Sequence, residues 1–147
     1  MTNEMISAKL ELKELVDSFS NFADTKDAIS QANLFTPDGI LEFQIGFEGD
    51  IHKIVGRETL VNAFSSTLNP CKALYHINGQ HNIKLNDDIT EANGISYCQA
   101  ILVNEVNGKD IMTTNYIRYV DHYVKIENKW YIKCRRSIFL VSDKHNL

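Results

Sequence analysis

The spacing of apolar residues changes partway along the chain, from a helical period to an alternating one. In the first third, apolar side chains recur three and four positions apart, which places them on one face of an α-helix. This spacing predicts a first helix over residues 7–22. Its apolar face consists of Leu12, Leu15, Val16, Phe19, Phe22 and Ala23.

Two shorter helices are expected after it. Asp24-Thr25-Lys26-Asp27 is typical of a helix cap with an acidic first turn, so a second helix should run from there to about Asn33. Thr36-Pro37-Asp38-Gly39 has turn chemistry and should end that segment. A third helix begins at Gly56-Arg57-Glu58 and stops at Asn69-Pro70. Its apolar side is formed by Leu60, Val61, Phe64 and Leu68.

The rest of the chain is predicted to form strands. Two short ones, at 40–47 and 51–55, flank the tight turn Glu48-Gly49-Asp50. Short links rich in turn-forming residues join the later strands, so these should be antiparallel neighbours. The four long strands are expected at 73–85, 90–103, 110–126 and 130–141.

Helices at one end followed by long strands indicate an α+β fold. The length of 147 residues fits one domain over 1–147. We expect three N-terminal helices packed on a strongly bent antiparallel sheet. A bent sheet closed by helices leaves concave space for a small molecule.

Composition narrows the classes of partner and cofactor. A net charge of −4 disfavours nucleic acid and anionic membranes as partners. No apolar run approaches the ~20 residues of a membrane span, and the N-terminus lacks the features of a signal peptide, which favours the cytoplasm. The cysteines, Cys71, Cys98 and Cys134, are far apart and should be reduced thiols. The spacing of the histidines predicts no metal site. The chain contains no glycine-rich nucleotide-binding motif, so no cofactor is predicted.

Several short stretches, in their order along the chain, carry a family resemblance. They are Phe22-Ala23-Asp24-Thr25-Lys26-Asp27, Leu34-Phe35-Thr36-Pro37-Asp38-Gly39, Val55-Gly56-Arg57-Glu58, His76-Ile77-Asn78, Arg118-Tyr119-Val120-Asp121-His122-Tyr123, Asn128-Lys129-Trp130-Tyr131-Ile132 and Arg135-Arg136. The ordered set resembles the SnoaL-like domains of the nuclear transport factor 2-like superfamily, which includes scytalone dehydratase, ketosteroid isomerase and limonene epoxide hydrolase. The resemblance implies a cone-shaped, cystatin-like roll.

The resemblance also implies a candidate catalytic pair. Dehydratase-like members place an aspartate at the end of the first helix and a histidine on the first long strand, and Asp24 and His76 stand at these positions. Imidazole is a base near neutral pH, and a carboxylate beside it fixes its tautomer. Two departures stand out: Phe19 occupies the position of a tyrosine, and Ala100 that of a second acid. These two, with Asn115 and Tyr119, are the expected substrate-binding residues.

Each of these residues has a plainer interpretation. His76 could be a strand histidine that bonds a backbone carbonyl, and Asp24 could cap the second helix. Tyr119 could make a cross-strand hydrogen bond. Asp121 is expected to form an ion pair with Arg135 or Arg136 on the neighbouring strand.

The strand at 90–103 alternates between small residues on one face and larger apolar residues on the other. The small face, expected inward, means room for a ligand or close packing of a helix. An exposed apolar strip on the outer face predicts a homodimer through that face. The small residues are Ala92, Gly94, Ser96, Cys98, Ala100 and Leu102, and the larger ones are Ile95, Tyr97, Ile101 and Val103.

Three functions follow as hypotheses. The first is a cofactor-independent lyase or isomerase acting on a small, largely apolar, oxygenated molecule. The second is a ligand-binding or scaffolding dimer without chemistry. The third is a structural subunit resembling the small β subunit of ring-hydroxylating dioxygenases.

Overall fold

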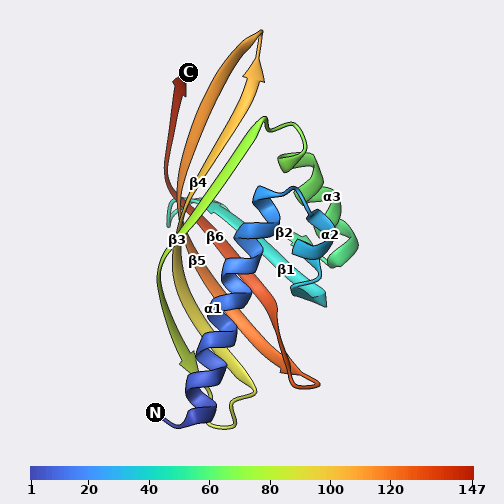
Figure 1. The fold of residues 1–147 in the computed structure, drawn as a ribbon, viewed down its shortest axis with the longest axis vertical. Helices are drawn as coiled ribbons and strands as arrows, with labels where there is room; N and C mark the ends of the chain where they lie inside the picture. The colour runs from blue at the N-terminus through green and yellow to red at the C-terminus, as the bar shows by residue number, and fades with distance from the viewer.

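The computed structural model describes all of residues 1–147. The six strands form one mixed sheet, and the three helices lie against one of its faces (Figure 1). The elements are α1 (Asn3–Asp24), α2 (Ala28–Ala32), β1 (Phe35–Ile45), β2 (His52–Val55), α3 (Arg57–Leu68), β3 (Ala73–Leu85), β4 (Glu91–Val106), β5 (Lys109–Ile126) and β6 (Lys129–Asn146). The α+β class predicted from the sequence is confirmed.

The strand order is β2-β1-β6-β5-β4-β3. All neighbouring pairs are antiparallel except β1 and β6, which run parallel. The expectation of an antiparallel sheet therefore needs one amendment. Residues 35–45 and 129–146 are far apart in the sequence, so no hairpin forces β1 and β6 to run antiparallel.

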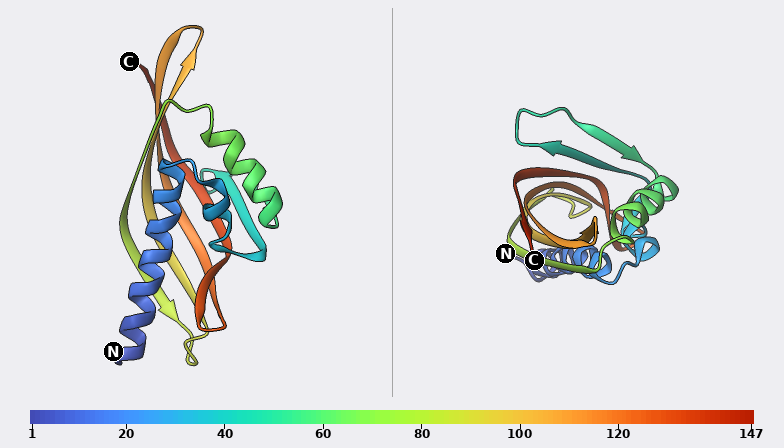
Figure 2. Two further views of the ribbon diagram at one scale, coloured as in Figure 1. Left: turned by 45° about the vertical axis from the view of Figure 1, so that its right-hand side comes forward. Right: turned by 90° about the horizontal axis from the view of Figure 1, so that it is seen from above.

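Register shifts bend the sheet. In β3 two residues, Gly79 and Gln80, stand opposite Tyr97 alone, because Asn78 pairs with Cys98 and His81 with Ser96. Further shifts lie in the β1–β6 and β5–β6 pairs. Such bulges sharpen local twist and bend a sheet. Viewed along the long axis, the strands curl round that axis and the helices lie along one side (Figure 2).

Helix α1 extends two residues beyond its predicted end, to Asp24, and the second helix is capped differently from the prediction. Asp27, not Asp24, is the N-cap of α2, and its side chain accepts a hydrogen bond from the Ser30 amide at 3.1 Å. The interpretation of Asp24 as a cap is wrong, because the longer α1 keeps that residue within its own last turn. The predicted turn at 36–39 is an irregular stretch within β1, where the β1–β6 register shifts.

The core lies between α1, α3 and the concave face of the sheet. As expected, Trp130 and Ile132 belong to it. All three cysteines are free thiols, with Cys71 and Cys98 buried and Cys134 half-buried. None of the helices combines the length and apolar character of a membrane span.

The ion pair expected between the last two long strands is confirmed. Arg135 Nε and Asp121 Oδ1 are 2.9 Å apart, and both side chains have no exposed surface. Burial alone would lower the pKa of Arg135, but the adjacent Asp121 carboxylate outweighs it and raises that pKa. Arg136 instead contacts Glu42 on the outer face of the sheet.

Candidate functional site

One face of α1 carries three polar residues at helical spacing, Asp17, Ser20 and Asp24, and this face lies against β3. Asn78 accepts a hydrogen bond from the Ser20 hydroxyl at 3.0 Å and donates one to Asp17 Oδ1 at 2.9 Å. These contacts dock α1 along β3 with its final turn beside His76. Asp24 is thereby held against the strand and not left free at the helix end.

Asp24 and His76 are joined by two hydrogen bonds. Asp24 Oδ1 lies 2.7 Å from His76 Nδ1, and Asp24 Oδ2 accepts a bond of 3.2 Å from the His76 backbone amide. The His76 side chain is only 10% exposed and that of Asp24 is 26% exposed. A carboxylate on Nδ1 keeps the proton there, so the neutral ring presents Nε2 as its acceptor.

His76 lies in the wall of a cavity of about 310 Å³ between the helices and the concave face of the sheet. The wall is mostly apolar, which is usual for a small-molecule site. Besides His76 its polar members are Gln31, Thr67, Asn115, Tyr119 and Ser137. The apolar members include Phe19, Ala23, Leu41, Phe43, Ile54, Phe64, Leu68, Ala100, Leu102, Ile117 and Phe139.

The structure brings the expected site residues together. Phe19, Ala100, Asn115 and Tyr119 line the same cavity as His76, and Asp24 lies behind the imidazole. The Ser142 hydroxyl donates to Asn115 Oδ1 at 2.7 Å, which leaves the amide Nδ2 as a donor. The Tyr119 ring packs edge-on against Phe19, and burial raises the pKa of its phenol, which therefore stays protonated.

The small-residue face of β4 leaves room for a ligand at one end, and at the other end it allows close packing of strand side chains, where close packing of a helix was the alternative considered. Ala100 and Leu102 line the cavity. At the other end of the strand, a Cβ added to Gly94 would lie 2.8 Å from the Tyr123 ring, so this glycine permits close packing. Small residues thus leave space at one end of the cone and fill it tightly at the other.

Gln31 is a site residue that the sequence analysis did not select. It lies on α2, is 2% exposed and lines the cavity. The available signal was its spacing from Ala28 and Ala32, which places it on the buried face of that helix. Ser137 and Phe139 of β6 were also missed, because the inward phase of β6 depends on a register shift that the sequence does not reveal.

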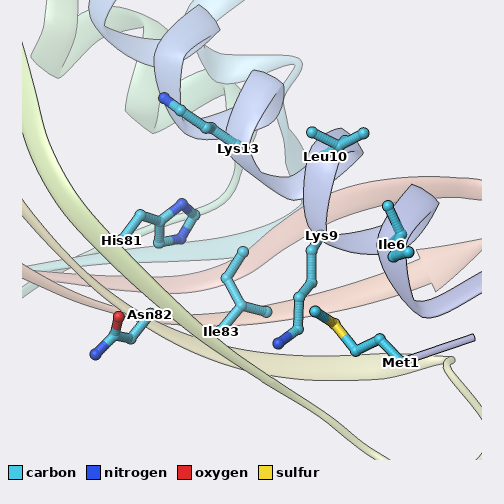
Figure 3. Close-up of a pocket in the computed structure, with 8 residues that line it drawn as sticks. All are labelled: Met1, Ile6, Lys9, Leu10, Lys13, His81, Asn82 and Ile83. Atoms are coloured by element: carbon cyan, nitrogen blue, oxygen red, sulfur yellow. The ribbon is translucent and has the colours of Figure 1, made fainter.

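A second, more open hollow of about 480 Å³ lies between the start of α1 and β3. Figure 3 shows His81 and Ile83 projecting from β3 toward α1. Neither residue of the candidate pair lines this hollow. No group of three or more His, Cys, Asp or Glu side chains comes together anywhere in the structure.

Comparison with known proteins places the chain in a family. The sequence model of the SnoaL-like domain matches residues 4–136, so the chain belongs to the SnoaL-like domain family. No curated protein matches it in sequence.

Solved structures show the same fold at low sequence identity. A putative scytalone dehydratase from Novosphingobium aromaticivorans is 20% identical, covers 100% of this chain and 93% of its own, and superposes with a TM-score of 0.81. A type 2 hexachlorocyclohexane dehydrochlorinase (LinA) is 13% identical over 97% and 91%, with a TM-score of 0.77. An NTF2-like protein with a cystatin-like fold, also from Novosphingobium aromaticivorans, is 16% identical over 92% and 84%, with a TM-score of 0.69. The SnoaL-like, cystatin-like fold implied by the resemblance is confirmed.

Proposed function

We propose that this protein is a cofactor-independent acid–base enzyme of the lyase or isomerase kind, acting on a small, largely apolar, oxygenated molecule. The observation that carries the proposal is the 2.7 Å contact between Asp24 and a histidine that lines an apolar cavity. Perturbed or paired titratable groups in such a cavity are the usual mark of an active site.

His76 is the base in this proposal. Its Nε2 has no hydrogen-bond partner in the protein and takes a proton from a carbon next to a substrate carbonyl. The electron pair of that C–H bond forms a carbon–carbon double bond as a β-hydroxyl leaves. The imidazolium returns the proton to the departing hydroxide, which gives water. Asp24 stabilises the imidazolium and holds the ring in place.

Two donors can stabilise the negative charge that develops on the carbonyl oxygen. The protonated phenol of Tyr119 and the Asn115 amide Nδ2 belong to the same wall as His76. Donors fixed in a water-poor, apolar environment stabilise such charge strongly, because no solvent has to reorganise. If no leaving group is present, the same proton transfer leads to isomerisation through an enolate.

The fold neighbours support elimination as the reaction type. Two of them are named as a dehydratase and a dehydrochlorinase, and both names describe the removal of a small molecule from a substrate. Because their sequence identity to this chain is low, the two neighbours support a class of reaction and do not indicate a substrate.

Ligand binding without chemistry is the second candidate function. Phe19 and Ala100 line the cavity at the positions where dehydratase-like members carry a tyrosine and a second acid, so neither contributes a titratable group. His76 is then the single base in the wall, so the cavity is equipped for binding but holds fewer catalytic groups than the sets of the dehydratase-like members.

A panel of cyclic β-hydroxyketones decides between the two candidates. The wild-type protein should release the conjugated enone, whose ultraviolet absorbance is measured directly, and His76→Ala should not. His122→Ala, which alters a solvent-exposed histidine that does not line the cavity, is the matched control. Equal turnover by wild type and His76→Ala would remove His76 from the mechanism. Thermal stabilisation by ketones without turnover would establish binding alone.

We further propose that a second copy of the chain docks on the outer face of the sheet. Tyr75 pairs with Ile101 across β3 and β4, and Ile95 pairs with Val120 across β4 and β5. Tyr75, Ile95 and Val120 are exposed. A strip of this kind on a twisted sheet matches its own copy under two-fold symmetry.

The docking proposal is tested by molar mass in solution. Wild type should sediment as a dimer, and Ile95→Lys should sediment as a monomer. Ile29→Lys, at an exposed apolar position on α2, should leave the dimer intact. A monomeric wild type would refute the interface.

A further inference from the structure

The wall of the cavity contains a buried hydrogen-bond acceptor that the protein itself does not use. Gln31, on α2, is 2% exposed and lines the cavity. Its Oε1 has no hydrogen-bond partner. Buried polar atoms are paired in the great majority of cases, because an unpaired one loses the hydrogen bonds it would make with water.

The orientation of the Gln31 amide is fixed by its neighbour. Its Nε2 donates to the backbone carbonyl of Phe19 at 3.2 Å. A carbonyl oxygen accepts hydrogen bonds and cannot donate them, so the nitrogen end of the amide must face Phe19. The oxygen end is therefore the unpaired one, because a flipped amide would set Oε1 against the Phe19 carbonyl oxygen, and both atoms are acceptors.

Two other polar atoms of the same wall are already paired within the protein. The Thr67 hydroxyl donates to the Ala63 carbonyl at 3.1 Å, and Asn115 Oδ1 accepts from Ser142. The hydrogen bond from Gln31 Nε2 to the Phe19 carbonyl links α2 to α1, which gives the nitrogen end of the side chain a structural role. That structural role leaves Oε1 unexplained.

We propose that Gln31 Oε1 accepts a hydrogen bond from the ligand, so that the ligand of this cavity carries a hydroxyl or amine donor. This inference rests on the proposed use of the cavity as a ligand site and narrows its substrate class. A volume of about 310 Å³ is near the lower end for small-molecule sites, which suits a single hydroxylated ring.

Gln31 and His76 approach the ligand from different elements, α2 and β3. Two polar contacts from separate sides fix the orientation of a ring that apolar walls alone would leave free to rotate. Gln31 is in this sense a specificity-determining residue. A site that pairs with a substrate hydroxyl also discriminates strongly against analogues that lack it, since its own buried group is then left unpaired.

The test uses matched ligand pairs and does not depend on turnover. The probes are 4-hydroxyacetophenone, which can donate from its hydroxyl, and 4-methylacetophenone, which cannot; 3-hydroxyacetophenone and 3-methylacetophenone form a second pair. Dissociation constants are measured by isothermal titration calorimetry or ligand-observed NMR. Wild type should prefer one or both hydroxyl probes by about tenfold, a difference of ~1.4 kcal/mol. Gln31→Met, which keeps the size of the side chain and removes the acceptor, should abolish that preference.

One further variant makes the result specific. Thr67→Val removes a hydroxyl from the same wall that is already bonded to Ala63, and it should retain the wild-type preference. Because the measurement is of binding and needs no turnover, failure of the catalytic proposal is distinguishable from failure of this one.

The melting temperature supplies a second readout. Gln31→Met removes the unpaired buried acceptor but also the hydrogen bond from Nε2 to the Phe19 carbonyl, so the ligand-free variant should melt close to the wild-type temperature while binding the hydroxyl probes less tightly. The proposal is overturned if Gln31→Met keeps the wild-type preference, or if neither hydroxyl probe binds the wild type more tightly than its methyl partner.

Discussion

Asp24 and His76 are 52 residues apart in the sequence, yet the two carboxylate oxygens of Asp24 bond both the ring and the backbone amide of His76. The second bond matters because it locates the strand as well as the side chain. The aspartate thus sets where the imidazole lies and which of its nitrogens faces the cavity.

This arrangement predicts how Asp24→Asn behaves. The amide keeps an oxygen acceptor but cannot stabilise an imidazolium, so kcat should fall while KM changes little. A general base contributes about 10²–10⁴-fold to the rate, and the decrease in kcat should be smaller than that full contribution. Steady-state kinetics on a hydroxyketone that the wild type converts provides the measurement. Glu14→Gln, at an exposed acid on α1, is the control and should keep its kcat.

The buried ion pair of Asp121 and Arg135 predicts a large stability effect. Asp121→Asn leaves a guanidinium with no exposed surface facing a neutral group, which should lower the free energy of unfolding by about 3–5 kcal/mol. Urea denaturation followed by circular dichroism measures it. Lys13→Gln breaks the exposed pair with Asp17 and should cost less than about 1 kcal/mol. Similar losses in both variants would contradict the assignment of burial as the cause.

Gly94 should not tolerate a side chain. A Cβ there would lie 2.8 Å from both Cε2 and the hydroxyl oxygen of Tyr123, a residue with no exposed surface. Gly94→Ala should therefore destabilise the fold by about 1–3 kcal/mol through overpacking. In Gly79→Ala the nearest atom is Tyr97 Cβ at 3.8 Å, an ordinary contact, so this variant should unfold at nearly the wild-type denaturant concentration.

Stability should fall as the pH is lowered from 7.5 to 5.5, and His81 is the expected cause. Burial lowers the pKa of His81 below the ordinary value of 6.5, with Arg135 and Lys13 contributing. Below pH 6.5 the unfolded chain binds a proton that the folded protein resists, so protonation favours unfolding. His81→Gln should flatten the dependence of melting temperature on pH in this range. The same substitution at exposed His145 should not, and an unchanged slope in His81→Gln would exclude His81 as the cause.

The features that could be predicted from the sequence are those that depend on local spacing. The end of α3 follows from Asn69-Pro70, and the alternation of β4 from its two-residue period, while its inward face comes from the family resemblance. The pairing of Asp121 with Arg135 or Arg136 follows from the expected neighbouring strands. The cap was misassigned because Asp24 and Asp27 are equally good capping residues by type. The longer α1, which ends at Asp24, and the contact of Asp24 with His76 across the fold separate their roles.

The role of Gln31 in the cavity could not be predicted from the local sequence pattern either. Spacing places it on the buried face of α2, but an unpaired Oε1 is visible only when every neighbour of the amide is known. The parallel pairing of β1 with β6 likewise depends on packing across the whole chain.

The two-residue bulge at Gly79 and Gln80 reverses which positions of β3 face α1: His76 and Asn78 do so before it, and His81 and Ile83 after it. The extra residue keeps both halves of the strand paired with the inward face of β4. A single-residue deletion at the bulge would restore plain alternation, so His81 and Ile83 would still face α1 and only the local bend would be lost. For protein engineering, this means that the curvature of the sheet at this point can be altered without changing which side chains of β3 face the helix.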